Sequence, residues 1–175
     1  MSTQTTTQEP VTAQRSTGQA AQSAPSISEF LAFKLGREEY GIDILRVQEI
    51  RSYEQPTRMA NAPSFILGVM NLRGVIVPII DMRIKFGLAE VKYDNFTVVI
   101  VLNIGAQVVG MVVDAVSDVI ALTPEQQRPV PDFSAAIDSN HVLAIGSVQD
   151  RMLVLLDIEK VMGRADMGLV TQSVQ

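Results

Sequence analysis

The sequence predicts a mainly β protein made of two five-stranded β-barrels packed together as an internal duplication, with short capping helices. Three observations lead to this fold class. Short apolar runs with strand spacing alternate with turn residues along most of the chain. A motif of strand, turn, strand and capped helix occurs at 68–87 and again at 146–163. Glycines 36 and 41 recur as glycines 105 and 110 at a constant offset of 69.

The motif at 68–87 contains all of these elements. Apolar runs at 69–72 and 75–81 flank Arg73-Gly74, and glycine readily adopts the positive φ of a tight hairpin turn. Asp81 can cap a short helix at 82–86, which Gly87 can end. The second copy repeats these features with Gln149-Asp150 as the turn, Asp157 as the cap and Gly163 as the stop.

Composition narrows the functional classes. The 175 residues are 47% hydrophobic and include no cysteine, which excludes disulfides, thiolate nucleophiles and cysteine-based metal sites. The net charge of −5 disfavours nucleic acid as a partner, because phosphate neutralisation needs an excess of basic residues. The longest apolar runs are strand-sized, so we expect no direct membrane insertion.

The domain organisation follows from the duplication. Residues 1–27, rich in Thr, Gln, Ser and Ala, are predicted to be a disordered tail without a secretory signal, so a cytoplasmic location is expected. The first barrel is predicted at 28–93, the second at 94–165, and a C-terminal tail at 166–175. A short helical stretch from Pro63 to Gly68 is also expected. Several strands are apolar on both faces, so the second face should be buried between the barrels.

The two copies differ in their polar residues and charge. Residues 28–93 hold nine Lys/Arg and eight Asp/Glu, whereas 94–165 hold four and nine. This asymmetry fits head-to-tail contacts between molecules, and it fits equally a surface that is only solvated. Recurring residues are interpreted as structural. The functional candidates are polar residues that occur in one copy: Arg51, Arg58, Asn71 and Arg73.

Catalysis finds little support in the sequence. The single histidine, His141, has no cysteine or second histidine with which to form a triad or metal site, and it is interpreted as a surface or satisfied loop residue. The carboxylates fall mostly at turns and caps, and no Walker or dinucleotide-binding loop occurs. We therefore expect a protein that is not an enzyme and has no cofactor.

Three segments carry a family resemblance. EEYGIDILRVQEI (38–50), NLRGVIVPIIDMRIKFG (71–87) and VVGMVVDAVSDVI (108–120) closely resemble the CheW-type chemotaxis coupling proteins, and the match extends over about 29–163. The resemblance implies a single CheW-like domain, at 28–165, of two SH3-like barrels. It also implies a cytoplasmic adaptor that links the histidine kinase CheA, through its regulatory domain, to the cytoplasmic tips of chemoreceptors, which recruit it to the inner face of the membrane.

The resemblance also implies site residues. Glu49 and Arg73 match paired polar positions near a partner-binding surface, and Gly68 and Asn71 shape the turn beside them. The apolar groove at the junction of the barrels, where receptors bind, corresponds to Ile44, Val47, Val98, Gly110, Val116 and Val119. We expect at least half of these groove aliphatic residues to be plain core. The alternative function is a small-ligand-binding or hydrolytic β-barrel, which needs a concave pocket with convergent polar groups.

Overall fold

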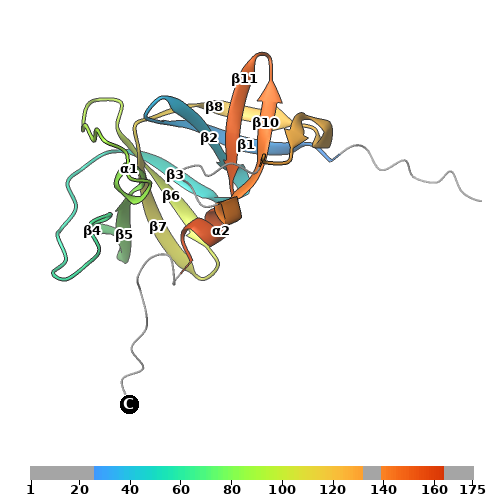
Figure 1. The fold of residues 1–175 in the computed structure, drawn as a ribbon. Coiled ribbons are helices and arrows are strands. Elements are labelled where there is room, and N and C mark those ends of the chain that lie inside the picture. Colours follow the sequence, from blue (N-terminus) through green and yellow to red (C-terminus); the bar gives the residue numbers. More distant parts are fainter. Residues whose placement is uncertain (1–25, 132–138, 164–175) are drawn as a thin grey trace, which may run out of the picture.

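The computed structural model describes residues 26–131 and 139–163, so residues 1–25 of the predicted tail and the predicted tail at 166–175 lie outside the described residues. Strands dominate, and the helices are short (Figure 1). The elements are, in order, β1 (Ser28–Leu35), β2 (Glu38–Asp43), η1 (Ile44–Arg46), β3 (Val47–Ser52), β4 (Ile66–Leu72), β5 (Val75–Asp81), α1 (Met82–Lys85), β6 (Val98–Ile104), β7 (Gln107–Val113), β8 (Ala115–Leu122), η2 (Pro124–Gln126), β9 (Gln127–Arg128), η3 (Ser139–His141), β10 (Val142–Val148), β11 (Arg151–Leu156) and α2 (Ile158–Val161).

The strands form two sheets. Sheet A has the order β8-β1-β2-β11-β10-β9, and sheet B has the order β3-β6-β7-β5-β4. Each sheet contains one parallel pair, β2 with β11 and β5 with β7, while its other pairs are antiparallel. The order of sheet B matches the first five strands of sheet A when the copies are superposed, as a duplication requires. The mainly β, two-barrel fold class is therefore confirmed.

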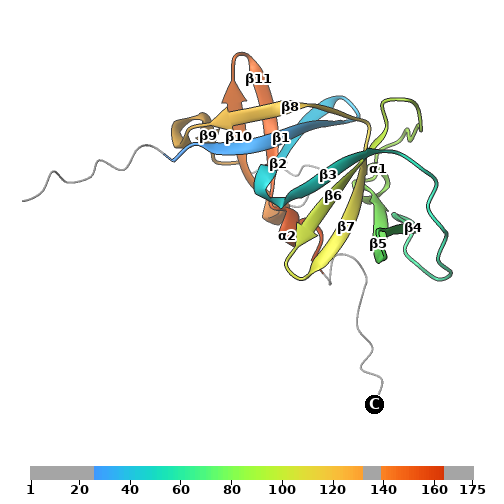
Figure 2. The ribbon, with the colours of Figure 1, turned by 180° about the vertical axis from the view of Figure 1, so that it is seen from behind.

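The copies exchange their first hairpins. β1 and β2 come from the first copy but pair with β8 and β11 of the second, whereas β6 and β7 of the second copy complete sheet B. Sheet B is consequently one continuous segment, 47–113, inserted between the two parts of sheet A (Figures 1 and 2). The division predicted at residues 93 and 94 does not separate the two sheets, because each sheet takes strands from both halves.

Strand alternation builds three cores. Successive side chains point to opposite faces, so Leu31 and Phe33 enter one core while Phe30 and Ala32 enter another. The largest core lies between the sheets and includes Ile100 of sheet B and both short helices. Each sheet also has a smaller core of its own. Because the sheets bury their second apolar faces against each other, the two barrels share one hydrophobic core.

Turns and caps follow the predicted pattern with one exception. Asp81 accepts a hydrogen bond from the Arg83 N–H at 3.0 Å and caps α1, and Asp157 caps α2. Arg73 and Gly74 both have positive φ, 54° and 86°. The predicted helix from Pro63 to Gly68 is wrong, because Gly68 lies inside β4 at a register shift, with a φ of 149°.

Candidate functional site

Glu49 and Arg73 meet at the rim of sheet B. Glu49 lies on edge strand β3, and Arg73 lies in the turn that follows the opposite edge strand, β4. The Arg73 Nη2 donates to the Glu49 Oε2 at 2.6 Å, and the Arg51 Nη1 lies 3.4 Å from the other carboxylate oxygen. The Asn71 Oδ1 accepts from the Gly74 N–H at 2.8 Å and holds the turn. The ion pair thus links the turn of the β4–β5 hairpin to the opposite edge strand of sheet B.

Sheet A has a counterpart of this pair. Asp118, which matches Glu49 at the offset of 69, accepts from the Arg151 Nη2 at 2.9 Å and from its Nη1 at 3.0 Å. Arg151 also pairs with Glu39 of β2. Comparison of the two copies missed this counterpart, because Arg151 stands two residues beyond the position that matches Arg73. The pair therefore recurs in both barrels, and its first role is structural.

Charge and exposure nevertheless single out the Arg73 turn. Hydrogen bonding from Arg73 lowers the pKa of Glu49, and hydrogen bonding from Arg151 likewise lowers that of Asp118. The Arg73 side chain is 71% exposed, compared with 35% for Arg151. Val75 and Ile76, the next residues of the hairpin, are 51% and 61% exposed. A fixed cation beside exposed apolar side chains suits contact with another protein.

The predicted groove residues fall into three groups. The four aliphatic residues Ile44, Val47, Val98 and Val116 are half-buried and pack against the core shared by the sheets. Val119, on edge strand β8, is 50% exposed. Gly110 is buried, and a Cβ there would come within 2.5 Å of the Ile79 Cδ1. Gly110 therefore serves the close approach of β5 and β7, whereas Val119 presents its side chain to solvent.

Sequence reasoning missed a buried ionic cluster beside α1. Asp81 and Arg83 are both fully buried, and the Arg83 Nε and Nη2 each lie 2.9 Å from an Asp81 carboxylate oxygen. The Arg83 Nη1 reaches the Asp114 Oδ1 at 2.9 Å, and the Tyr93 hydroxyl donates to Asp81 at 2.8 Å. The sequence assigned Asp81 to capping alone. An arginine flanked by apolar residues in a short helix after a buried strand was the available signal.

The described part of the surface includes a groove and a cavity. A groove of about 560 Å³ runs along β2 and β11, lined by Glu38, Arg151 and Met152 among others, and a cavity of about 340 Å³ lies between Tyr53, Arg58 and Tyr93. A small-ligand-binding barrel would use such concavities.

Within 26–131 and 139–163, no cluster of His, Cys, Asp or Glu could hold a metal ion, and no helix is long and apolar enough to span a membrane. His141 is half-buried at the end of η3.

Two β-sheets with a shared core define a paired SH3-like β protein. Comparison with known proteins identifies its family. The family model described as the CheW-like domain matches residues 29–166, so the chain belongs to the CheW-like family of chemotaxis scaffold proteins. It is 60% identical over 142 residues to a chemotaxis protein CheW of Klebsiella aerogenes, which covers 81% of this chain and 86% of the relative. A Helicobacter pylori chemotaxis protein CheW is 32% identical over 147 residues, 84% of this chain and 88% of the relative.

A solved structure supports the same assignment. The crystal structure of the scaffolding protein TtCheW from Thermoanaerobacter tengcongensis superposes with a TM-score of 0.70 and 31% sequence identity, covering 78% of this chain and 88% of that chain. The family predicted from the sequence is confirmed.

Proposed function

We propose that this protein is an adaptor that couples transmembrane chemoreceptors to the histidine kinase CheA. It works in the cytoplasm, is held at the inner face of the membrane through the receptors, and catalyses no reaction of its own. Membership of the CheW-like family supports this function. The structural observation that carries it is the exposed Arg73, fixed at the tip of the β4–β5 hairpin by Glu49 and flanked by exposed apolar side chains.

The Arg73 turn is the proposed kinase-binding surface. Arg73 and Gly74 both occupy the left-handed region, and Asn71 holds the turn, so the guanidinium is presented with little conformational freedom. A preorganised arginine loses less entropy on binding and can form charge-assisted hydrogen bonds with a carboxylate or carbonyl of the partner. Val75 and Ile76 supply the apolar area beside it. The regulatory domain of CheA is the proposed partner.

The proposed receptor-binding surface is the apolar groove that the family resemblance implies at the junction of the sheets. Val119 is half-exposed, and Ile44, Val47, Val98 and Val116 lie at the margin of the shared core. An apolar groove of this kind accepts the apolar face of an amphipathic helix. The helical tip of a chemoreceptor offers such a face. The adaptor would thereby hold kinase and receptor in one geometry, and control would require contacts that differ between receptor states.

Kinase autophosphorylation in receptor-bearing membranes tests the proposal. Wild type should bring the kinase under receptor control. Arg73→Ala should weaken kinase binding, and Val119→Asp should weaken receptor binding, each by roughly tenfold or more, which is the scale of a buried interface residue. Lys92→Ala is the matched control for Arg73, because it removes one positive charge from a side chain that is 79% exposed.

Circular dichroism on the same preparations shows that each variant is folded. A wild-type protein without effect on kinase or receptor overturns the proposed function. If it binds a small molecule in a ligand screen as well, the alternative of a ligand-binding barrel replaces the adaptor.

A further inference from the structure

The chain passes between the sheets at two junctions, and each junction is tied to a short helix by an ion pair. At the first, η1 connects β2 of sheet A to β3 of sheet B, and Arg46 of η1 pairs with Glu159 of α2. At the second, Asp114 connects β7 of sheet B to β8 of sheet A and pairs with Arg83 of α1. Arg83 and Glu159 occupy matching positions, at the same offset of 76 that relates Asp81 to Asp157. The helix partners of the two junctions therefore match and carry opposite charges, whereas the junction partners differ, because Arg46 matches Ala115 and Asp114 matches Leu45 at the offset of 69.

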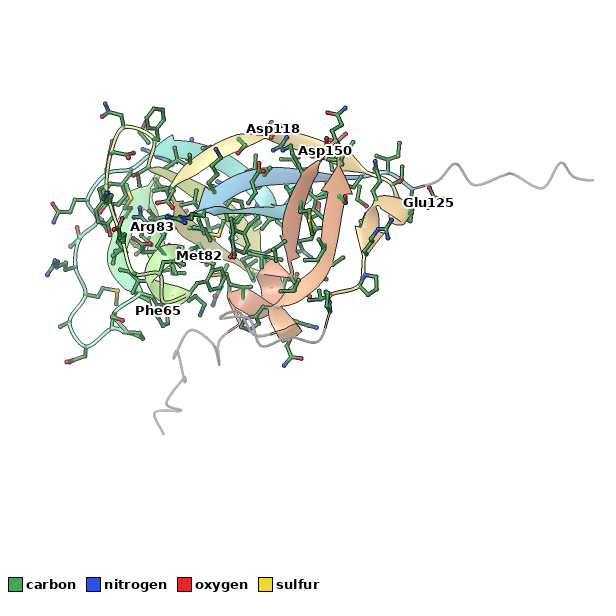
Figure 3. All side chains as sticks on the ribbon, turned by 45° about the horizontal axis from the view of Figure 1, so that its top comes forward. Phe65, Met82, Arg83, Asp118, Glu125 and Asp150 are labelled. Carbon is green, nitrogen blue, oxygen red and sulfur yellow. The ribbon has the colours of Figure 1, made fainter. Side chains whose placement is uncertain are left out.

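The Asp114 junction is held by bonds in several directions. The Asp114 Oδ1 accepts from the Arg83 Nη1 at 2.9 Å, and its Oδ2 accepts from the Gly36 N–H at 2.6 Å. The Asp114 N–H donates to the Lys34 carbonyl at 3.1 Å. Gly36 and Lys34 belong to the β1–β2 hairpin of sheet A, whereas α1 extends from β5 of sheet B. Figure 3 shows Arg83 between α1 and the strands of sheet A. One residue thus ties both barrels together.

Arg83 makes this junction stiff. Its side chain is fully buried, and its donors are taken by Asp81, Asp114 and the Lys92 carbonyl, while the Tyr93 ring lies 4.8 Å from the guanidinium carbon. Burial by itself would lower the pKa of Arg83, but the hydrogen bonds to Asp81 and Asp114 hold it above its usual value. Arg83 therefore stays charged, and rotation of one barrel against the other would separate its buried guanidinium from Asp114.

The Arg46 junction is different. Its ion pair, 2.7 Å between the Arg46 Nη1 and the Glu159 Oε1, joins side chains that are 38% and 51% exposed. Water can replace either partner at small cost, so a solvated pair of this kind constrains geometry weakly. Corresponding links between the two sheets are thus rigid at Asp114 and loose at Arg46.

The shared core does not by itself fix how the barrels are oriented. Apolar burial is non-directional, so it resists separation of the sheets more strongly than rotation between them. Hydrogen bonds are directional and weaken steeply with angle. We propose that Asp114 and Arg83 are positioning residues that set the angle between sheets A and B. If the proposed adaptor function holds, the same two residues set the geometry between the kinase-binding and receptor-binding surfaces.

A distance measurement between the sheets tests the positioning role without any partner. The chain has no cysteine, so Ser52→Cys on β3 and Ser147→Cys on β10, both at exposed positions, place one spin label on each sheet. Pulsed dipolar spectroscopy then gives the distance distribution. Asp114→Asn should shift the distribution or broaden it roughly twofold, as expected when a packed interface gains alternative arrangements. Glu159→Gln, the matched control at the other junction, should leave it unchanged.

Arg83→Lys is the second variant, because it keeps the positive charge but loses the planar fork that binds both carboxylates. It should broaden the distribution as well. The proposal is overturned if folded Asp114→Asn or Arg83→Lys protein shows the wild-type distribution, even with a lowered melting temperature. It is also overturned if Glu159→Gln broadens the distribution as much as they do.

A second readout separates this proposal from the proposed function. Binary affinities of Asp114→Asn for the kinase regulatory domain and for receptor should stay near wild type, while receptor control of the kinase falls roughly tenfold, a typical size for coupling between sites. A changed distance distribution with unchanged receptor control keeps the positioning role and refutes its link to signalling. Wild type without any kinase or receptor effect refutes the adaptor function, and the distance measurement still decides the positioning role.

Discussion

Replacing Gly68 with alanine should be among the most damaging single substitutions in sheet B. Gly68 has a φ of 149°, a conformation that residues with a Cβ rarely adopt. A Cβ there would lie 2.0 Å from the Thr57 carbonyl oxygen, compared with 3.4 Å or more for an ordinary contact. Thr57 and Val69 exchange two backbone hydrogen bonds, of 2.9 and 2.8 Å, that pin the loop against β4. The loop cannot retreat without breaking both bonds.

The magnitude follows from these contacts. Backbone strain in this region costs about 1–3 kcal/mol, and each lost hydrogen bond costs about 1 kcal/mol. Gly68→Ala should therefore lower the free energy of unfolding by about 3–5 kcal/mol. Gly74 is the matched control, because its φ is 86° and, its chain neighbours apart, no atom lies within 4 Å of the place that a Cβ would take. Gly74→Ala should cost only about 1–2 kcal/mol, the ordinary penalty of a left-handed residue with a Cβ.

Urea unfolding followed by circular dichroism measures both variants. The slopes should equal that of wild type, so that the difference lies in the midpoints. Equal destabilisation by the two substitutions would refute the argument, because backbone conformation alone would then explain the whole effect and the contact with Thr57 would count for nothing.

Three further predictions concern the barrels and their junction. Gly110→Ala should cost about 1–3 kcal/mol in urea unfolding, because its Cβ would meet Ile79 and force repacking; a neutral effect would show that β5 and β7 separate easily. Because hydrogen bonding from Arg73 lowers the pKa of Glu49, their pair stabilises the fold above the ordinary glutamate pKa of 4.5 and loses that contribution as the pH falls. Unfolding midpoints measured down to about pH 3 should therefore depend less on pH in Glu49→Gln than in wild type, and identical profiles would contradict this. Arg83→Met should cost about 3–5 kcal/mol by calorimetry, since it leaves the buried Asp81 and the partly buried Asp114 without their cation; a stabilised variant would show that the cluster serves only geometry.

The local structure was largely predictable from the sequence, because hairpins and caps depend on residues close together in the chain. Arg73-Gly74 and Gln149-Asp150 form the predicted turns, with positive φ at all four positions. The capping aspartates also act as predicted. The prediction of a helix stop at Gly68 is wrong for a long-range reason, because the residue that demands a glycine there, Thr57, lies eleven positions earlier and meets it only in the folded sheet.

The long-range pairing could not be read from the duplication. Two similar copies are compatible with strands that pair within each copy or with hairpins exchanged between copies, since both arrangements bury the same apolar faces. The ion pairs of the candidate site were also only partly predictable from the sequence. Glu49 and Arg73 were found through family resemblance, but their counterpart, Asp118 with Arg151, needed the spatial arrangement of sheet A. Asp114 had no local signal at all, because its partners come from two other parts of the chain.

The insertion of sheet B into sheet A determines the order in which the protein can be completed during synthesis. The β1–β2 hairpin leaves the ribosome before the other strands, yet its neighbours β8 and β11 follow only after all of sheet B, and about 70 residues separate β2 from β8. At roughly 5–20 residues per second, the nascent hairpin spends several seconds without its sheet partners. Sheet B can pair its strands in that interval. Its apolar face toward sheet A, however, packs against the same β1–β2 hairpin. Completion therefore waits until β11 has emerged, and until then the β1–β2 hairpin lacks both of its neighbours in sheet A.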